Sequence, residues 1–345
     1  MSGRGTLVKW LVALCVLHGV IACAGFFAPY DPAEQDRAHP FLPPMRIHIV
    51  DAEGKFHARP FVYPLQLKEG SFDQYTEATD ERIPLEFFVT GVPYRLLGIL
   101  SCRIHLFGAR GTRVFLLGSD GYGRDQLSRI LYGGQISLLA GLLGAGISIF
   151  LGFLCGTAAG YFGGWRDDLF MRLAELFFAL PWLYLLFALR AFLPLAVSPT
   201  EAFLLVIAVL GTVGWARPAR LVRGVVLSVK ERDFVRAARG FGATKWYLIR
   251  RHIMPETSSV LLTQTAILVP QFVLAEMTLS FLGLGVPEPA PSWGNLLTCL
   301  QQYSVLVSYW WMYLPALAVV PFFLGYLGLA NALQEHFGAY GVEGN

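Results

Sequence analysis

The sequence predicts an all-α polytopic membrane protein with a β-rich insertion after its first membrane span. Of the 345 residues, 55% are hydrophobic and only 15% are charged, and the mean hydropathy is +0.52. A soluble domain carries about 25% charged residues, so this deficit indicates several membrane spans. The 26 Phe and 8 Trp residues exclude a disordered chain, a collagen and a coiled coil.

Six apolar segments approach or exceed the roughly 20 residues that a membrane-spanning helix needs. They are Leu7–Ala28, Ile136–Tyr161, Leu169–Leu193, Ala202–Ala216, Val260–Leu282 and Tyr309–Leu333. The fourth is the shortest, and its apolar character extends towards Val226. We divide the chain accordingly, and the divisions are a first transmembrane helix at 1–28, an insertion at 29–118, an amphipathic pre-helix segment at 119–135, a core with five transmembrane helices at 136–335 and a tail at 336–345.

The first apolar segment also resembles a cleavable signal peptide. Arg4 and Lys9 precede an apolar run, and Val20-Ile21-Ala22-Cys23 has the pattern of a lipoprotein cleavage box. The run continues through Phe26 and Phe27, which is longer than a typical signal-peptide core. We therefore favour a retained first span.

The insertion at 29–118 has the composition of a small soluble domain, with ten basic and eleven acidic residues. Short β-type runs separated by turn residues occur at 46–50, 85–89, 103–107 and 113–117. Its histidines are His39, His48, His57 and His105. None has zinc-ligand spacing, so we expect solvated side chains, no metal site and no catalytic cluster.

Basic residues predict the orientation in the membrane. The stretch 217–251 holds ten basic and two acidic residues, a net charge of +8, whereas the whole chain carries only +3. Loops rich in Lys and Arg stay in the cytoplasm. With six spans and with Arg4 and Lys9 near the start, both termini are predicted to be cytoplasmic and the insertion to face outward.

Nucleotide, metal and hydrolase motifs are missing from the sequence. No G-x-x-x-x-G-K-[ST], H-E-x-x-H or G-x-S-x-G occurs, and Gly121-Tyr122-Gly123 does not open a dinucleotide fingerprint. We expect a chain that is not an enzyme and that holds no cofactor. Its energy must come from a partner protein or from an ion gradient.

The basic loop contains a candidate docking helix. Phe234, Ala237, Ala238 and Phe241 share one face of a helix, and the small Ala residues let that face enter a groove on another protein. Gly240 and Gly242 are predicted to end this helix. A nucleic-acid or lipid-headgroup site explains the charge but not the small apolar face, so we favour a cytosolic protein partner.

A second short helix is predicted to follow the docking helix. Trp246, Ile249 and Ile253 fall on one face of it, and Pro255 is expected to stop it before the next span. The loop is therefore predicted to be a two-helix element that runs from 217 to 255.

The loop resembles the "EAA" loop of permease subunits of ATP-binding-cassette (ABC) importers. Ala237-Ala238, Gly242 and Pro255 carry the match. Across 116–335 the sequence looks like the second, C-type permease of the dipeptide/oligopeptide/nickel branch. The motifs that carry this are Gly118-Ser119-Asp120 to Arg129, Gly160-Tyr161-Phe162-Gly163-Gly164-Trp165, Leu279-Ser280-Phe281-Leu282-Gly283-Leu284-Gly285 and Pro291-Ser292-Trp293-Gly294. Arg236 stands at the usual glutamate position.

The resemblance implies a type I importer fold with six helices in the cell inner membrane. It implies a second homologous permease, two cytosolic ABC ATPases that hydrolyse the ATP, and an extracytoplasmic solute-binding protein. It also implies peptides or peptide-like solutes as substrate, and the long insertion resembles the subset associated with larger peptides. The ATPase-docking residues implied here are Phe234, Arg236, Ala237, Ala238, Phe241, Gly242 and Pro255.

Two groups within the spans are candidates for packing and transport. Gly152, Gly156 and Gly160 have the spacing of close helix packing. Polar residues at membrane depth usually face a cavity or a partner, which makes Gln264, Gln271 and Glu276 candidates for the translocation path. A structural hydrogen bond is the competing role for Glu276.

Two other classes of protein stay open at this point. An ion-driven secondary transporter or channel should show internal repeats and paired intramembrane charges, and no clear repeat is seen. A membrane-anchored enzyme would need a catalytic cluster within 29–118.

Overall fold

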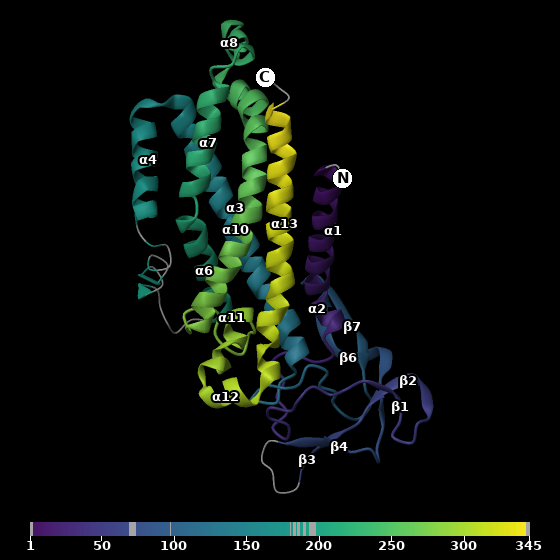
Figure 1. The fold of residues 1–345 in the computed structure, drawn as a ribbon. Coiled ribbons are helices and arrows are strands. Elements are labelled where there is room, and N and C mark those ends of the chain that lie inside the picture. Colours follow the sequence, from purple (N-terminus) through teal and green to yellow (C-terminus); the bar gives the residue numbers. More distant parts are fainter. Residues whose placement is uncertain are drawn as a thin grey trace. The chain divides into compact units, whose positions relative to one another are not determined.

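The computed structural model describes residues 3–68, 74–96, 98–179, 181, 184, 187–188, 191–192 and 198–342. Five helical stretches within these residues are long and apolar enough to cross a membrane. The chain divides into two compact units, which are described separately. The helical unit comprises 1–14, 138–279 and 322–345, and the mixed unit comprises 15–137 and 280–321. Figure 1 shows the helices and the strands of the two units.

The first two spans are α1 (Gly3–Ala22), followed by the short α2 (Ala24–Phe27), and α3 (Gln126–Phe162). Residues 126–135, which the sequence assigns to the amphipathic segment at 119–135, form the first turns of α3. Asp125 caps this helix, because its Oδ2 accepts hydrogen bonds from the backbone N–H of Ser128 at 2.8 Å and from its hydroxyl at 2.6 Å. No proline interrupts the 37 residues that follow.

The middle of the chain forms α4 (Gly164–Ala179), α6 (Pro199–Val213) and α7 (Ala216–Val229). The second half of the predicted span Leu169–Leu193 lies largely outside the described residues. Ser198 and Glu201 form a capping box at the start of α6. The fourth predicted span continues through α7, so 199–229 is one stretch long enough to cross a membrane.

The last two spans are α10 (Met254–Phe281) and α13 (Leu314–Val342), with Pro270 and Pro321 inside them. Between them lie the short helices α11 (Trp293–Leu296) and α12 (Tyr303–Ser308), and two 3₁₀ turns at Thr298–Gln301 and Trp310–Tyr313. In the helical unit, α3 runs beside α7 and α10 (Figure 1).

The described residues of the insertion form three small antiparallel sheets. One has the order β1 (His48–Val50), β2 (Phe56–Val62), β5 (Ile83–Pro84), and another pairs β3 (Leu65–Leu67) with β4 (Tyr75–Glu77). The third is a long hairpin of β6 (Glu86–Leu96) and β7 (Leu100–Gly108). The prediction of a β-rich insertion is confirmed.

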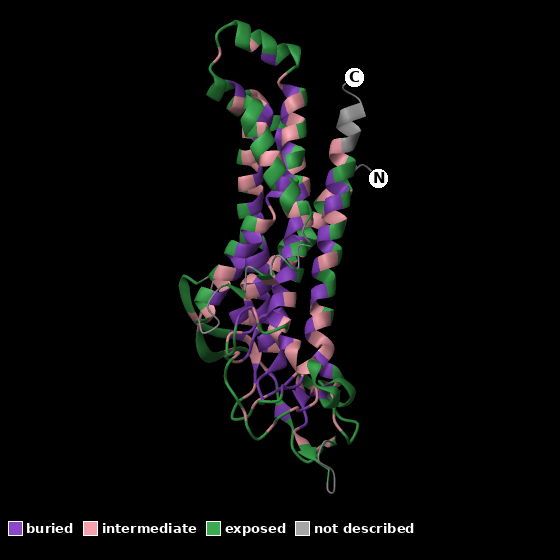
Figure 2. Cartoon of the chain, turned by 90° about the vertical axis from the view of Figure 1, so that its left-hand side faces the viewer, coloured by how far each residue is buried: buried purple, intermediate pink, exposed green. Residues whose placement is uncertain are grey.

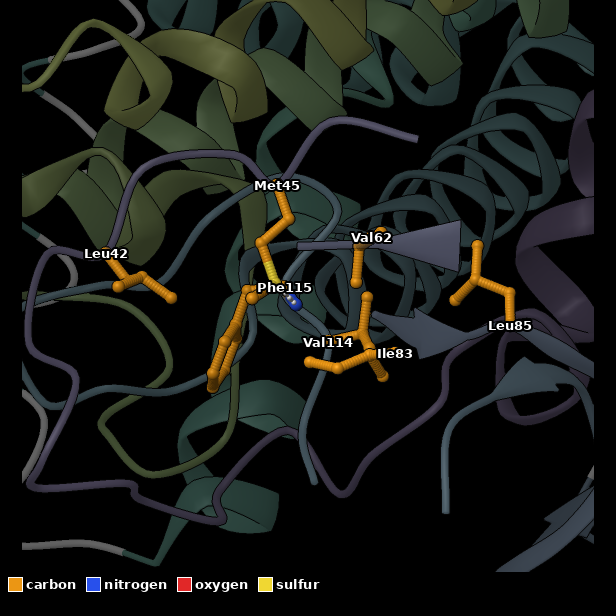
Figure 3. Close-up of a cluster of buried hydrophobic side chains, with 7 residues drawn as sticks. All are labelled: Leu42, Met45, Val62, Ile83, Leu85, Val114 and Phe115. Carbon is orange, nitrogen blue, oxygen red and sulfur yellow. Dashed lines mark hydrogen bonds between the residues drawn. The ribbon is translucent and has the colours of Figure 1, made fainter. Parts of the chain in front are cut away.

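The predicted strand at 113–117 is wrong, because this segment pairs with no strand among the residues that the structure describes. It is an extended connector in which the Val114 N–H donates to the Tyr30 hydroxyl at 2.7 Å and the Phe115 carbonyl accepts from the Met45 N–H at 2.9 Å. Val114 and Phe115 fill the core of the mixed unit together with Leu42, Met45, Val62, Ile83 and Leu85 (Figure 3). Burial of apolar side chains therefore holds this segment in place.

His105 also departs from its expectation. We expected it in solvent, but its side chain is buried, with Nδ1 2.6 Å from the Ala28 carbonyl and Nε2 2.9 Å from the Val92 carbonyl. The other three histidines of the insertion lie beside carboxylates, which are those of Asp36, Glu77 and Asp51.

Candidate functional site

The loop between α7 and α10 folds back against the end of α7. It consists of α8 (Asp233–Gly240), α9 (Lys245–Leu248) and a π-helical turn at Ile249–Ile253. One cluster of buried residues holds it together: Val222, Val226, Val229, Val235, Leu248 and Ile253. The loop is therefore a packed element whose position is fixed by apolar contacts with α7.

The end of α8 is a Schellman motif built around Gly242. The Gly242 N–H donates to the Arg239 carbonyl at 3.0 Å, and the Ala243 N–H donates to the Ala238 carbonyl at 3.1 Å. Gly242 has φ +85°, the left-handed region that favours glycine. Gly240, by contrast, is the last helical residue and has no positive φ.

The predicted docking face of α8 is largely exposed. Phe234 is 45% exposed and Phe241 92% exposed, and Ala237 is exposed between them. Ala238 is half-buried against the α7 cluster, and Val235 is fully buried there. Sequence periodicity did not single out Val235, which is the residue that anchors the helix. Figure 2 shows how much of this loop is exposed.

The second half of the loop differs from its prediction. Pro255 does not stop a helix, because α9, the π turn and α10 form one helical stretch from Lys245 to Phe281. Pro255 is the second residue of α10, where a missing N–H is tolerated. Trp246 is 70% exposed whereas Ile253 is fully buried, because the wider π turn shifts the helical phase between them.

Polar contacts join α7, from which the loop continues, to α4 and α3. The Arg223 guanidinium of α7 pairs with both carboxylate oxygens of Asp167 in α4, with Nε–Oδ1 2.5 Å and Nη2–Oδ2 2.6 Å. The Lys230 ammonium donates to the Gly160 carbonyl near the end of α3 at 3.0 Å. The bidentate pair is the stronger tie, since it fixes orientation as well as distance. Arg236 is exposed on α8.

Gly152, Gly156 and Gly160 form a line along α3 that faces α7. A Cβ added to Gly152 would lie 2.5 Å from the Pro218 Cβ, and one added to Gly160 would lie 2.8 Å from the Val226 Cβ. A Cβ on Gly156 would collide with the Ala219 carbonyl. The two helices approach so closely that only glycine fits.

The three polar residues of α10 have different surroundings. Gln264 is 6% exposed and Glu276 is fully buried, whereas Gln271 is exposed. Gln264 has an amide oxygen without a hydrogen-bond partner among the described residues.

The mixed unit contains a polar cluster whose function the sequence did not indicate. Arg124 donates to Asp120 at 2.7 Å and to Glu288 at 2.7 Å, and Arg129 donates to the same Glu288 at 2.7 Å. Both arginines are nearly fully buried, and they border a cavity of about 580 Å³. The two arginines belong to the Gly118–Arg129 motif noted in the sequence. Their partner Glu288 lies far along the chain, so no local pattern indicated the cluster.

Asp125, which caps α3, belongs to the same region and is fully buried. Burial raises the pKa of its carboxyl group to about 6, although the hydrogen bonds from Ser128 lower it. Trp293 supports this region from α11, because its indole N–H donates to the Ile130 carbonyl at 3.0 Å and its backbone N–H to the Ser137 hydroxyl at 3.1 Å.

Comparison with known proteins identifies relatives of this chain. Residues 148–337 match the family described as "Binding-protein-dependent transport system inner membrane component". A putative peptide permease protein of Brucella ovis is 35% identical over 221 residues, covering 64% of this chain and 71% of its own length. The oligopeptide transport system permease protein OppC of Haemophilus influenzae is 38% identical over 221 residues, covering 63% and 69%. The MetNI methionine ABC transporter has a TM-score of 0.41 at 17% identity, covering 59% of this chain and 95% of its own.

Proposed function

We propose a function for the chain from one premise: it belongs to the family of binding-protein-dependent transport system inner membrane components. It is accordingly a membrane-spanning permease subunit of an ABC importer. Such a subunit is non-catalytic, and ATP is hydrolysed on partner subunits.

The proposed substrate class is peptides. Relatives that match about two thirds of this chain are named peptide permease and oligopeptide transport system permease. The proposed partners are a second homologous permease, two cytosolic ATPases and an extracytoplasmic solute-binding protein. With the +8 loop in the cytoplasm, both termini would lie there as well.

The observation that carries the coupling proposal is the exposed apolar face of α8. Phe234, Ala237 and Phe241 face away from the α7 cluster, although exposure of large aromatic side chains to water is unfavourable. We propose that this face seats in a groove of an ATPase. Because Val235 and Gly242 fix α8 against α7, closure of the ATPases would move α7 and α10 with it.

We propose further that Gln264, Gln271 and Glu276 contribute to the translocation path. The exposure of Gln271 on α10 supports a path that is completed by the second permease. In this arrangement the buried Glu276 and Gln264 would stabilise the wall of the path.

The test compares two variants of α8 with a control. Phe241→Ala and Ala237→Glu, each in the chain co-expressed with its partner subunits, should abolish ATP-dependent uptake of a labelled tripeptide and reduce the ATPase that co-purifies. Tyr303→Ala, at another aromatic residue that is mostly exposed (80%), should leave ATPase co-purification unchanged. Full ATPase recovery with both α8 variants would overturn the docking proposal.

A further inference from the structure

The β6–β7 hairpin ends in a turn whose described residues include two exposed apolar side chains. Residues 96–100 read Leu-Leu-Gly-Ile-Leu, and Ile99 and Leu100 are 83% and 61% exposed. Arg95 and Arg103 flank the turn, are exposed, and form no ion pair with any residue that the structure describes. An apolar turn with two available cations is unusual in a soluble domain.

The contacts of the segment that leaves α1 show which way this turn points. A Cβ on Gly25 would collide with the ring of Tyr94, which lies near the turn. Three residues later, the Ala28 carbonyl lies within hydrogen-bond distance of the His105 ring. His105 is opposite Val89 in the hairpin, so it lies further from the turn than Tyr94 does. Residues 25–28, which follow α1, therefore run along the hairpin in the direction away from its turn.

It follows that the turn points back along α1, towards the bilayer that α1 crosses. Figure 1 shows β6 and β7 beside α2, at the end of α1. Gly98 lies four positions after Tyr94, and at about 3.4 Å per residue the turn reaches roughly 14 Å beyond the Gly25 contact. The headgroup region of one leaflet is only about 5–8 Å thick. The turn is thus long enough to cross it.

We propose that this turn is a membrane anchor that inserts into the lipid leaflet beside α1. Ile99 and Leu100 lie at the edge of the acyl chains, while Arg95 and Arg103 contact lipid phosphates. The hairpin is continuous with the lipid-facing span through its contacts with Gly25, Phe26 and Ala28. Because the hairpin contacts the segment that directly follows a membrane span, we infer that lipid, and not another protein, covers the turn.

The test measures depth along the hairpin in the full chain. The five native cysteines are replaced, and an environment-sensitive fluorophore is attached to Ile99→Cys, Ile104→Cys or Phe87→Cys, whose native side chains are all more than half exposed. The protein is reconstituted into vesicles of phosphatidylethanolamine and phosphatidylglycerol with a headgroup-proximal spin-labelled lipid. Quenching should be at least about twofold stronger at position 99, in the turn, than at position 87, far from it. Position 104 lies between them along the hairpin and should give an intermediate value.

Equal quenching at positions 99 and 87 would overturn the proposal. A blue-shifted but unquenched label at 99 would also overturn it, since a protein would then cover the turn. A second measurement tests the charges: Arg95→Glu with Arg103→Glu should reduce quenching at 99 in vesicles with phosphatidylglycerol more than in phosphatidylcholine alone. The same loss in both lipids would contradict the role of the arginines.

Discussion

The Ala243 N–H donates a 3.1 Å hydrogen bond to the Ala238 carbonyl across Gly242, whose φ is +85°. This bond brings two alanines from opposite sides of the turn against the same buried cluster of α7. The position of α8 relative to α7 is therefore set by one glycine conformation and by apolar contacts with this cluster.

Gly242→Ala should uncouple the transporter without a steric clash. A Cβ there meets no atom within 4 Å, but the left-handed conformation costs an alanine about 1 kcal/mol. Part of the population should therefore lose the Schellman turn and shift α8. We expect less peptide transported per ATP hydrolysed, measured in proteoliposomes with the partner subunits.

Gly240→Ala is the matched control for this prediction. It also has open space for a Cβ, yet it is helical, so alanine should be neutral or stabilising there by about 0.5 kcal/mol. An equal loss of coupling in both variants would mean that the conformation of Gly242 is not the cause.

Gly156→Leu should separate α3 from α7. The added side chain would collide with the Ala219 carbonyl and crowd Val222, and overpacking of this kind costs about 1–3 kcal/mol. We expect a lower melting temperature of the purified chain. Gly146→Leu on the same helix, where a Cβ meets nothing, should melt as the parent does.

The Asp167–Arg223 pair should contribute measurable coupling energy. Both side chains are partly buried and the geometry is bidentate, so a double-mutant cycle with Asp167→Asn and Arg223→Gln should give an interaction energy of about 1 kcal/mol. Unfolding in a mild detergent is the readout. Strictly additive single effects would show that α4 and α7 are held by apolar packing alone.

Asp125 should make stability depend on pH. Burial raises the pKa of its carboxyl from 3.8 to about 6, so the folded state binds more protons than the unfolded state between these values. The stabilisation of the fold by the protonated Asp125 carboxyl is fully present below pH 3.8 and is lost as the pH rises through about 6. We expect the melting temperature to fall over this window.

Asp125→Asn isolates this effect. An asparagine still caps the helix through its side-chain oxygen, but it does not titrate. The variant should lose the slope between roughly pH 4 and 6 and retain its stability at neutral pH. A slope identical to that of the parent would assign the pH dependence to other groups.

The prediction of an all-α membrane protein with a β-rich insertion is confirmed, because hydrophobic length and β-type alternation are local properties of a segment. The boundaries were less accurate. The start of α3 depended on whether Asp125 caps a helix, and the fate of 113–117 depended on whether a strand lay beside it. Both are decided by neighbours in space.

The sequence by itself determined the class of protein and the location of the basic loop, since composition and spacing suffice for these. Tertiary structure alone decided that Val235 anchors α8, that Pro255 lies within a helix, and that Arg129 meets Glu288, 159 residues away. It also decided the direction of the hairpin turn. Such features follow from side-chain packing between distant segments, which no local pattern encodes.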